Sequence, residues 1–367
     1  MSLGGMLKAS DGYLHHMTPP AVMLATALAV TLLLNFFLQG SSLWYWFPVQ
    51  YDDSIKLYAL ATEKRHYDVI TIGSSVSARD LIPQVMEEEL NRLLPKPEPW
   101  LVYDASVSAG DFPAFIAISR SILSARQQPR AVILMFSTFN FNANRTSETM
   151  ALQIKLFSTG AHDFFTLMRH APRADSRLAA IDSLTHGLTV LMQSPLLRSD
   201  RGLVRDRQQN HGSTYYYPFT PEAVAANNKM LPTENQTTAE VESEKVRIVR
   251  ERNLTDFEIG PLIQSWMQEL IGQLRAKNIK VIVTLAPESS WFMRAAYRDE
   301  REKSARYLAE FAAREGIIYQ DLSEPPYHPA AAEYFDGADH LGPQGAERLS
   351  RQIAGRLLVP ALAGAAR

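Results

Sequence analysis

Residues 67–83 read YDVITIGSSVSARDLIP, and this stretch decides how the rest of the chain is interpreted. An apolar run, VITI, stops at Gly73, and two serines and a helix-like segment follow directly. A short apolar run without alternation suits a strand that is buried on both faces of a parallel sheet. Ser74 and Ser75 then lie on the turn between the strand and the helix. A serine placed there is a candidate nucleophile at the sheet edge, or it only caps the helix.

The same pattern recurs along the chain. The apolar runs are Asp68–Ile72, Trp100–Tyr103, Ala131–Phe136 and Lys280–Leu285, with a shorter fifth run at Ile317–Tyr319. Apolar residues at helical spacing lie within residues 113–127, 257–277, 300–315 and 343–357. Alternating strands and helices predict an α/β fold with a doubly wound, mostly parallel sheet. Residues 145–255 break this alternation, and we expect them to form a largely helical or irregular insertion.

Composition excludes several classes of protein. The chain has 367 residues, of which 46% are hydrophobic, and its net charge is −2, so it lacks the basic excess of a nucleic-acid-binding protein. Cysteine is absent, which excludes a disulfide, a thiol nucleophile and a thiolate metal site. Because neither phosphate-binding glycine loops nor histidines at metal-ligand spacing occur, we expect no cofactor and no metal.

One long uncharged segment indicates a membrane-anchored protein. Residues 21–38 read AVMLATALAVTLLLNFFL, and as a helix this stretch spans roughly 27 Å, close to the hydrocarbon thickness of a bilayer. An aromatic cluster at residues 43–47 follows, as at a membrane interface. A buried core helix and a cleaved signal peptide are the alternatives. We favour an uncleaved anchor, because the preceding segment carries a single lysine and no clear cleavage site follows.

The anchor divides the chain. We expect an N-terminal tail at 1–20, a transmembrane anchor at 21–40, an interfacial aromatic linker at 41–54 and an α/β domain at 55–367. Lys8 before the anchor, against Asp52 and Asp53 after it, favours a cytoplasmic N-terminus. The α/β domain would then lie outside the cytoplasm.

Polar residues gather after the apolar runs, where ligands bind in an open parallel sheet. Residues 73–75 follow the first run, 104–111 the second and 137–142 the third, and FDGADHLGP occupies residues 335–343. A serine nucleophile needs a base, and histidine serves when a carboxylate fixes its tautomer. His340 is the candidate base within the last segment.

This ordered set resembles the SGNH hydrolase superfamily, also called GDSL-like. The resemblance covers about residues 65–140 and 280–357 and leaves out the middle third of the chain. With its membrane anchor, the chain looks most like the alginate O-acetyltransferases and the D-alanyl-transfer protein of teichoic-acid synthesis. The resemblance implies that Ser75 is the nucleophile, and Ser74 stands where the family often has aspartate.

The carboxylate partner of His340 is open. The family's aspartate lies three residues before the histidine, where this chain has Gly337. Either Asp336 or Asp339 takes the role instead. We favour Asp336, because residues i and i+4 share a face if 336–340 forms a helical turn.

The resemblance also implies an oxyanion hole. Its donors would be the backbone N–H groups of Ser75 and of Ser106 or Gly110, together with Asn140, which stands one position later than the family's asparagine. A single serine at a strand-to-helix turn can supply such a donor from its own backbone.

These features lead to one leading hypothesis. We expect a Ser-His-Asp acyltransferase, anchored in the bacterial inner membrane with a periplasmic or extracellular domain, that O-acetylates a cell-surface or secreted polysaccharide. The resemblance implies a multi-span membrane O-acyltransferase as partner. The alternatives are an acyl esterase of the same polymer and a non-catalytic scaffold in a polysaccharide secretion or modification complex.

Overall fold

The computed structural model describes residues 22–23, 26, 29–30, 51–124, 127–144, 161–171, 176–181, 201–213, 220, 254, 256–289, 298–334 and 339–363. These residues contain one sheet with the strand order β2-β1-β3-β4-β5, and every neighbouring pair is parallel. The strands are β1 (Val69–Gly73), β2 (Val102–Asp104), β3 (Ala131–Phe136), β4 (Lys280–Leu285) and β5 (Ile318–Asp321). The predicted parallel α/β sheet is confirmed, and the bounds of β3 and β4 are those expected from the sequence.

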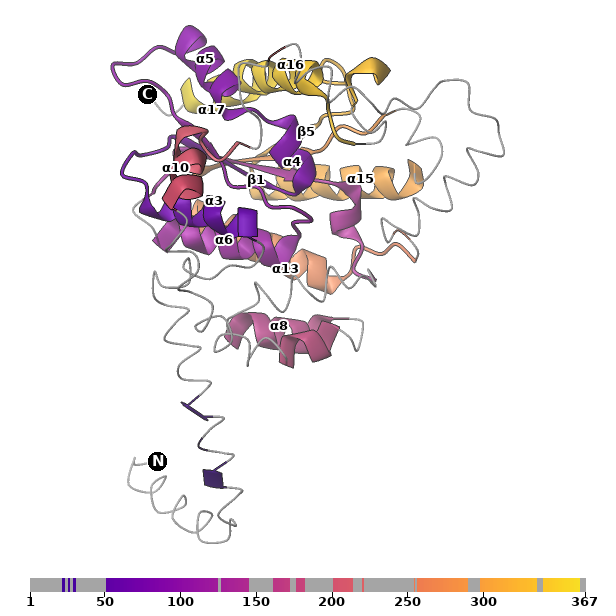
Figure 1. Ribbon diagram of the computed structural model, residues 1–367. Helices are drawn as coiled ribbons and strands as arrows, with labels where there is room; N and C mark the ends of the chain where they lie inside the picture. The colour runs from indigo at the N-terminus through magenta and orange to yellow at the C-terminus, as the bar shows by residue number, and fades with distance from the viewer. Residues whose placement is uncertain are drawn as a thin grey trace.

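One face of the sheet is covered by four helices, α3 (Tyr51–Thr62), α6 (Phe112–Ser124), α13 (Pro261–Arg275) and α15 (Arg298–Glu315) (Figure 1). Alternate strand residues such as Ile70, Ile72 and Leu134 point into this layer. Phe112 stacks on Phe136 and on Trp266, with ring centroids 5.2 and 5.9 Å apart. Aromatic rings bury a large apolar area each, so they contribute strongly to this layer. The buried residues on this face form the larger of the two clusters in the core.

The other face is covered by α4 (Ser75–Asp80), α5 (Pro83–Leu93), α16 (Pro343–Ile353) and its continuation, a π-helical turn η5 (Ala354–Leu358) and α17 (Val359–Ala363). Val69, Ile133 and Ile282 pack against this second layer. Helices α5, α13 and α16 each have proline at a first position, where its fixed φ suits the helix and the missing N–H costs no hydrogen bond. Helices on both faces make the sheet doubly wound, as predicted.

Helix α3 differs from the prediction. It begins at Tyr51, inside the expected interfacial linker of residues 41–54, so regular structure starts four residues before the expected domain boundary. The reason is its apolar side, because Ile55, Leu57 and Leu60 are buried against the domain.

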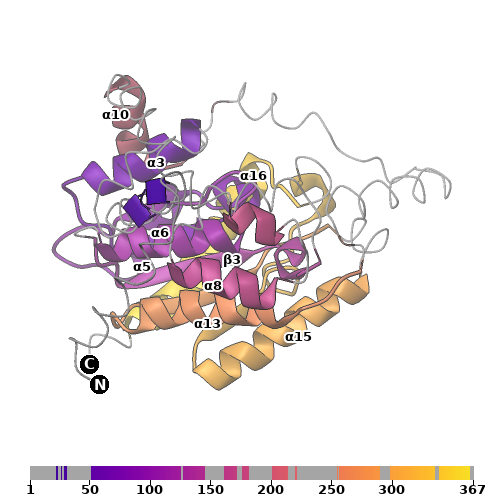
Figure 2. The ribbon, with the colours of Figure 1, turned by 90° about the horizontal axis from the view of Figure 1, so that it is seen from below.

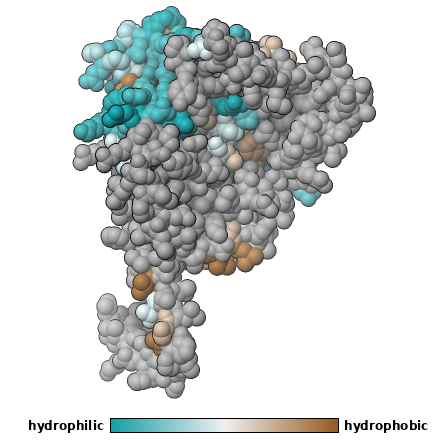
Figure 3. Space-filling view, in the orientation of Figure 1, coloured by the Kyte–Doolittle hydropathy of each residue, from teal (hydrophilic) through white to brown (hydrophobic). Residues whose placement is uncertain are grey.

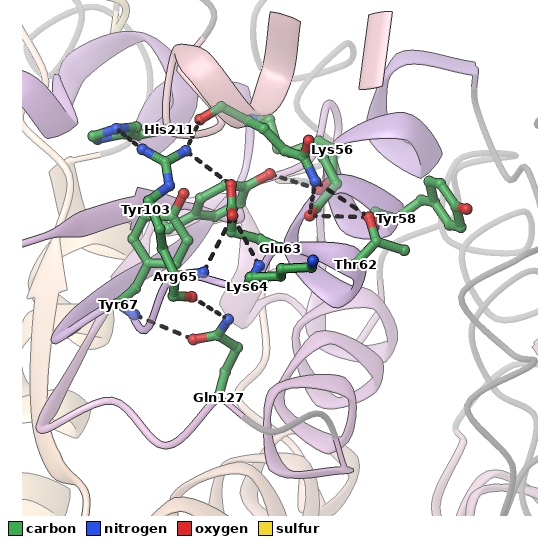
Figure 4. A network of polar contacts seen from close by, with 12 residues as sticks. Lys56, Tyr58, Thr62, Glu63, Lys64, Arg65, Tyr67, Tyr103, Gln127 and His211 are labelled. Carbon is green, nitrogen blue, oxygen red and sulfur yellow. Dashed lines mark hydrogen bonds and ion pairs between the residues drawn. The ribbon is translucent and has the colours of Figure 1, made fainter. Parts of the chain in front are cut away.

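The insertion at 145–255 is described in part. It contributes α8 (Ala161–His170), a helical segment at 176–181 and α10 (Arg201–Gln209). After α10 the chain covers the edge of β2, where Asp104 N–H donates to the His211 carbonyl at 2.9 Å. Figure 4 shows Arg65 between Glu63, at 2.8 Å, and His211, at 3.2 Å. This segment therefore covers a strand edge that would otherwise expose unpaired backbone groups.

The expected anchor lies mostly outside the described residues. Within it, Val22, Met23, Thr26, Ala29 and Val30 are helical. Among the described parts of the chain, no helix combines the length and apolar character needed to cross a bilayer.

Candidate active site

Ser75 lies where β1 ends and α4 begins. Ser74 is the N-cap of α4, and its hydroxyl oxygen accepts a hydrogen bond from Val76 N–H at 3.3 Å. Gly73 is required before them, because a Cβ there would lie 2.4 Å from Ser77 Cβ and 2.7 Å from the Met135 carbonyl oxygen. The two serines are thus distinct, since Ser74 caps the helix and Ser75 is free to face another element.

That other element carries His340. Ser75 Oγ lies 3.1 Å from His340 Nε2, although the two residues are 265 positions apart in the chain. His340 lies in the loop between the 3₁₀ turn η4 (Ala331–Glu333) and α16. The hydroxyl can donate to Nε2 when the ring proton is on Nδ1.

A carboxylate lies on the other side of the ring. Asp339 Oδ1 is 3.1 Å from His340 Nδ1, and the Asp339 side chain is only 1% exposed. This pairing stabilises the tautomer that leaves Nε2 able to accept the serine proton. The structure therefore places Asp339, the less favoured of the two candidates, beside the histidine.

Asp336 lies outside the described residues, within 335–338. The preference for it assumed that 336–340 forms a helical turn. Instead, Asp339 lies at a bend, and Leu341 pairs with Tyr334 in an antiparallel bridge. Because Asp339 and His340 are not helical, the i and i+4 spacing gives no reason to prefer Asp336 over Asp339.

The loop that carries His340 is tied to the helix that carries Ser75. Leu341 N–H donates to Asp80 Oδ1 at 2.8 Å, and Asp80 is the last residue of α4. Ile82 N–H donates to the Ser350 hydroxyl of α16 at 2.9 Å. These contacts fix the distance between the nucleophile and the base across two elements that are far apart in sequence.

The predicted oxyanion donors are brought to the same edge, but their hydrogens are used within the protein. Ser106 N–H donates to Asp104 Oδ1 at 3.0 Å, and Gly110 N–H donates to the Val107 carbonyl at 3.0 Å. Asn140 is fully buried, and its amide donates to the Gly110 carbonyl at 3.2 Å and to Asp111 Oδ1 at 3.1 Å. Each of these three candidate groups therefore already donates to an acceptor within the protein.

Backbone N–H groups on two adjacent turns are further candidate donors. The first N–H groups of a helix have no partner within it, and Ser75 N–H is one of these at the start of α4. The second belongs to Ala109, whose φ of 52° lies in the left-handed region. Its turn is held against the nucleophile turn, because Val107 N–H donates to the Gly73 carbonyl at 3.0 Å. Unusual backbone conformations of this kind gather at functional sites.

A buried ion pair missed by the sequence analysis supports this loop. Lys56 of α3 lies 2.8 Å from Asp104 Oδ2, and the two side chains are 3% and 0% exposed. Lys56 also donates to the Ser106 carbonyl at 2.8 Å, and the Ser106 hydroxyl donates to Ser77 Oγ at 2.8 Å. The chain of contacts therefore runs from α3 through the β2 loop to α4. No signal in the sequence links Lys56 to a loop 48 residues away.

A second buried network lies at the ends of β3, β4 and β5. Arg301 Nη1 is 2.6 Å from Glu288 Oε2, and the Thr138 hydroxyl donates to Glu288 Oε1 at 3.1 Å. Arg301 also pairs with Asp321. Burial raises the pKa of Glu288 and the charge of Asp339 raises it further, against the opposing effect of Arg301. The carboxylate beside His340 is therefore electrostatically coupled to this network.

Among the described residues, no group of three or more histidine, aspartate or glutamate side chains is placed to hold a metal ion. The arrangement of a hydroxyl, an imidazole and a buried carboxylate is suited to nucleophilic acyl transfer, which these residues could carry out themselves. Neither the protein-family models nor the curated protein sequences contain a match for this chain, so the geometry of the site carries the functional argument.

Proposed function

We propose that this chain is a membrane-anchored serine O-acyltransferase that modifies a cell-surface or secreted polysaccharide outside the cytoplasm. The observation that carries the proposal is the run of contacts from Ser75 through His340 to Asp339. It lies at the carboxyl edge of a parallel sheet, where ligands bind in open α/β folds. The resemblance to SGNH hydrolases adds the substrate class.

The reaction would proceed in two steps. Ser75 Oγ attacks the acyl carbonyl carbon while His340 Nε2 takes the hydroxyl proton, and the carbonyl electron pair moves to oxygen. Collapse of this intermediate breaks the bond to the leaving group, which receives the proton from His340. A sugar hydroxyl then loses its proton to His340 and attacks the carbonyl carbon of the acyl-serine. Collapse of this second intermediate breaks the bond to Ser75 Oγ, which takes the proton back from His340, and the acyl group stays on the sugar.

The negative oxygen of the intermediate needs donors. We assign this task to Ser75 N–H at the start of α4 and to Ala109 N–H on the adjacent turn. Asn140 would act indirectly, because it fixes the Gly110 carbonyl and so the shape of the turn.

The alternatives differ in what accepts the acyl group. In an esterase, water replaces the sugar hydroxyl in the second step. A non-catalytic scaffold would be expected to separate Ser75 from His340 by packed side chains, and the 3.1 Å contact between them disfavours it.

The membrane assignment rests on residues 21–38 and on the resemblance. An anchor of this kind would hold the domain at the outer face of the bacterial inner membrane and bring it to a multi-span O-acyltransferase partner. That partner would pass acyl groups across the bilayer.

A two-product assay tests the proposal. The full chain is given an activated acetyl ester and an unacetylated oligosaccharide, and released acetate and acetylated oligosaccharide are both measured. We expect both products from the wild type and a loss of at least about 10³-fold in Ser75→Ala. The control is Ser119→Ala, a buried serine of α6 whose hydroxyl donates to Gln273 at 2.8 Å.

The outcomes separate the hypotheses. If acetate is released but no acetylated oligosaccharide forms, the transferase hypothesis is wrong and the esterase hypothesis is supported. Equal activity of Ser75→Ala and Ser119→Ala removes Ser75 as nucleophile.

A further inference from the structure

The two described helices in the first part of the insertion carry an unusual outer face. On α8, Phe165 is 67% and Met168 39% exposed; on the segment 176–181, Leu178 is 63% and Ile181 46% exposed. Each pair is spaced by three residues, so its members share one side of a helix. Figure 3 shows apolar residues gathered on the underside of the domain, at the position of α8 in Figure 1. We name these four residues the apolar face.

This face is rigidly attached to the domain. Asp163 of α8 accepts from Arg120 of α6 at 2.8 and 2.6 Å, and Arg120 also pairs with Glu269 of α13. Leu167 is fully buried in the core, and Arg177 donates to the Ala171 carbonyl at 3.1 and 2.9 Å. The helices are therefore fixed on their inner side while their outer side stays exposed.

Among the described residues, the exposed charges on the same helices have one sign. Among the side chains that the structure describes on these two helices, the exposed ones are the four of the apolar face and two arginines, Arg169 and Arg177. The acidic residue described there, Asp163, is buried against Arg120. Large apolar side chains flanked by basic residues are the pattern of a helix that lies in the headgroup region of an anionic membrane.

The position of the apolar face also fits contact with a membrane. The described residues of the expected anchor lie beyond the α8 end of the molecule, away from α5 and α16 (Figure 1). Met23 and Val30 of that segment are 73% and 49% exposed, so apolar side chains are also presented there. Figure 2, seen from below, shows α8 over the layer of α6 and α13.

We propose that the apolar face rests on the surface of an anionic lipid bilayer, as a second membrane contact beside the anchor. The proposal rests on the membrane location given under the proposed function. It adds an orientation, because the layer of α6 and α13 then separates the membrane from the sheet. The site around Ser75 would be held on the water side, where a polymer can reach it.

Site-specific spin labels test this contact, and the absence of cysteine from the chain makes each introduced cysteine unique. Phe165→Cys is labelled in the full chain, reconstituted into vesicles that contain phosphatidylglycerol. The matched control is Leu93→Cys on α5, an apolar residue that is 40% exposed at the opposite end of the molecule (Figure 1). Power saturation then compares the access of oxygen, which partitions into lipid, with that of a water-soluble nickel chelate.

We expect the label at 165 to be reached better by oxygen than by nickel, and the label at 93 to show the reverse. Reversing the charge of the exposed Arg169, in Arg169→Glu, should lower the oxygen-to-nickel ratio at 165 severalfold. Equal nickel access at both positions overturns the proposal. So does protection of position 165 from both reagents, which indicates a protein partner, and so does failure of the chain to bind the vesicles.

The result is independent of catalysis. The same labels in a Ser75→Ala background should give the same accessibilities. A chain that is inactive as an acyltransferase but lipid-exposed at 165 would leave the membrane contact standing and remove only the reaction.

Discussion

Ser74 and Ser75 are adjacent in sequence but have different surroundings. Ser74 is 1% exposed and accepts from the backbone of α4, which is the structural role of an N-cap. Ser75 is half-buried and lies against His340. The local sequence leaves both roles open for either serine, because a glycine turn followed by a cap uses the same residue types as a nucleophile turn. Only the resemblance to the SGNH hydrolases favours Ser75 as nucleophile.

The first prediction at the residue scale concerns which carboxylate, Asp339 or Asp336, is the partner of His340. Asp339→Asn keeps the size of the side chain but no longer stabilises the Nδ1-protonated ring or its charged form. We expect the rate of acyl transfer to fall by about 10³- to 10⁴-fold. Asp336→Asn is the matched control and should stay within a few-fold of wild type. The reverse ranking in steady-state kinetics would return the role to Asp336.

Gly73 makes a second prediction at this scale. Gly73→Ala places a Cβ 2.4 Å from Ser77 Cβ and 2.7 Å from a backbone oxygen, so the turn must shift. We expect a loss of about 1–3 kcal/mol in the free energy of unfolding and a large loss of activity. Gly272→Ala in α13 has no atom within 4 Å of the added Cβ and should raise stability by up to about 1 kcal/mol. Urea unfolding measures both, and equal effects would contradict the crowding argument.

At the scale of elements, α3 is part of the site's support. Its first four residues, 51–54, belong to the segment that the sequence predicts to be a linker, because residues of mixed polarity show no clear helical period. The ion pair between Lys56 and Asp104 shows why the helix matters, since it joins α3 to the loop after β2. Contacts between distant segments of this kind depend on the folded topology and cannot be found from local patterns.

Lys56→Met tests this link. It leaves the carboxylate of Asp104 buried without its cation, which costs about 3–5 kcal/mol of stability. The control is Lys64→Met, an exposed lysine in the segment after α3, which should change stability by less than about 0.5 kcal/mol. Denaturant unfolding of both variants measures the difference in stability. A Lys56→Met chain as stable as Lys64→Met would contradict a stabilising role for the Lys56–Asp104 ion pair.

The loop before His340 is held by a second ion pair, between Arg348 of α16 and Glu333 of η4, at 2.7 and 2.9 Å. Burial acts to raise the pKa of Glu333, but hydrogen bonds from Arg348 and from Ala330 N–H lower it overall from 4.5. A lowered folded-state pKa means that the pair stabilises the protein above 4.5 and that this contribution is lost as the pH falls through the folded value.

Glu333→Gln should therefore lower the free energy of unfolding by about 0.5–1 kcal/mol at neutral pH. The difference from wild type should shrink to nothing in strong acid, where Glu333 is protonated in both states. Thermal unfolding over this pH range measures the difference. A gap that stays constant with pH would show that the loss is one of packing rather than of charge.

At the scale of the whole molecule, much of the fold followed from the sequence. The predicted strands Ala131–Phe136 and Lys280–Leu285 have the same bounds as β3 and β4. Their prediction succeeded because a short continuous apolar run flanked by loop residues is typical of a buried strand in a parallel sheet. The convergence of Ser75 and His340 was expected from the same topology. The hydrogen bonds that Ser106, Gly110 and Asn140 make to their neighbours could not be predicted, because only the folded loops bring these groups together.

The central claim is that Ser75, activated by His340, attacks an acyl or sulfonyl centre. Mass spectrometry of the full chain after treatment with a sulfonyl fluoride tests it most directly. The account predicts one covalent adduct, on the peptide that contains Ser75, with fragment ions that exclude Ser74. It also predicts that His340→Asn slows this labelling strongly. An adduct spread over other serines, or labelling of His340→Asn at the wild-type rate, would contradict the account.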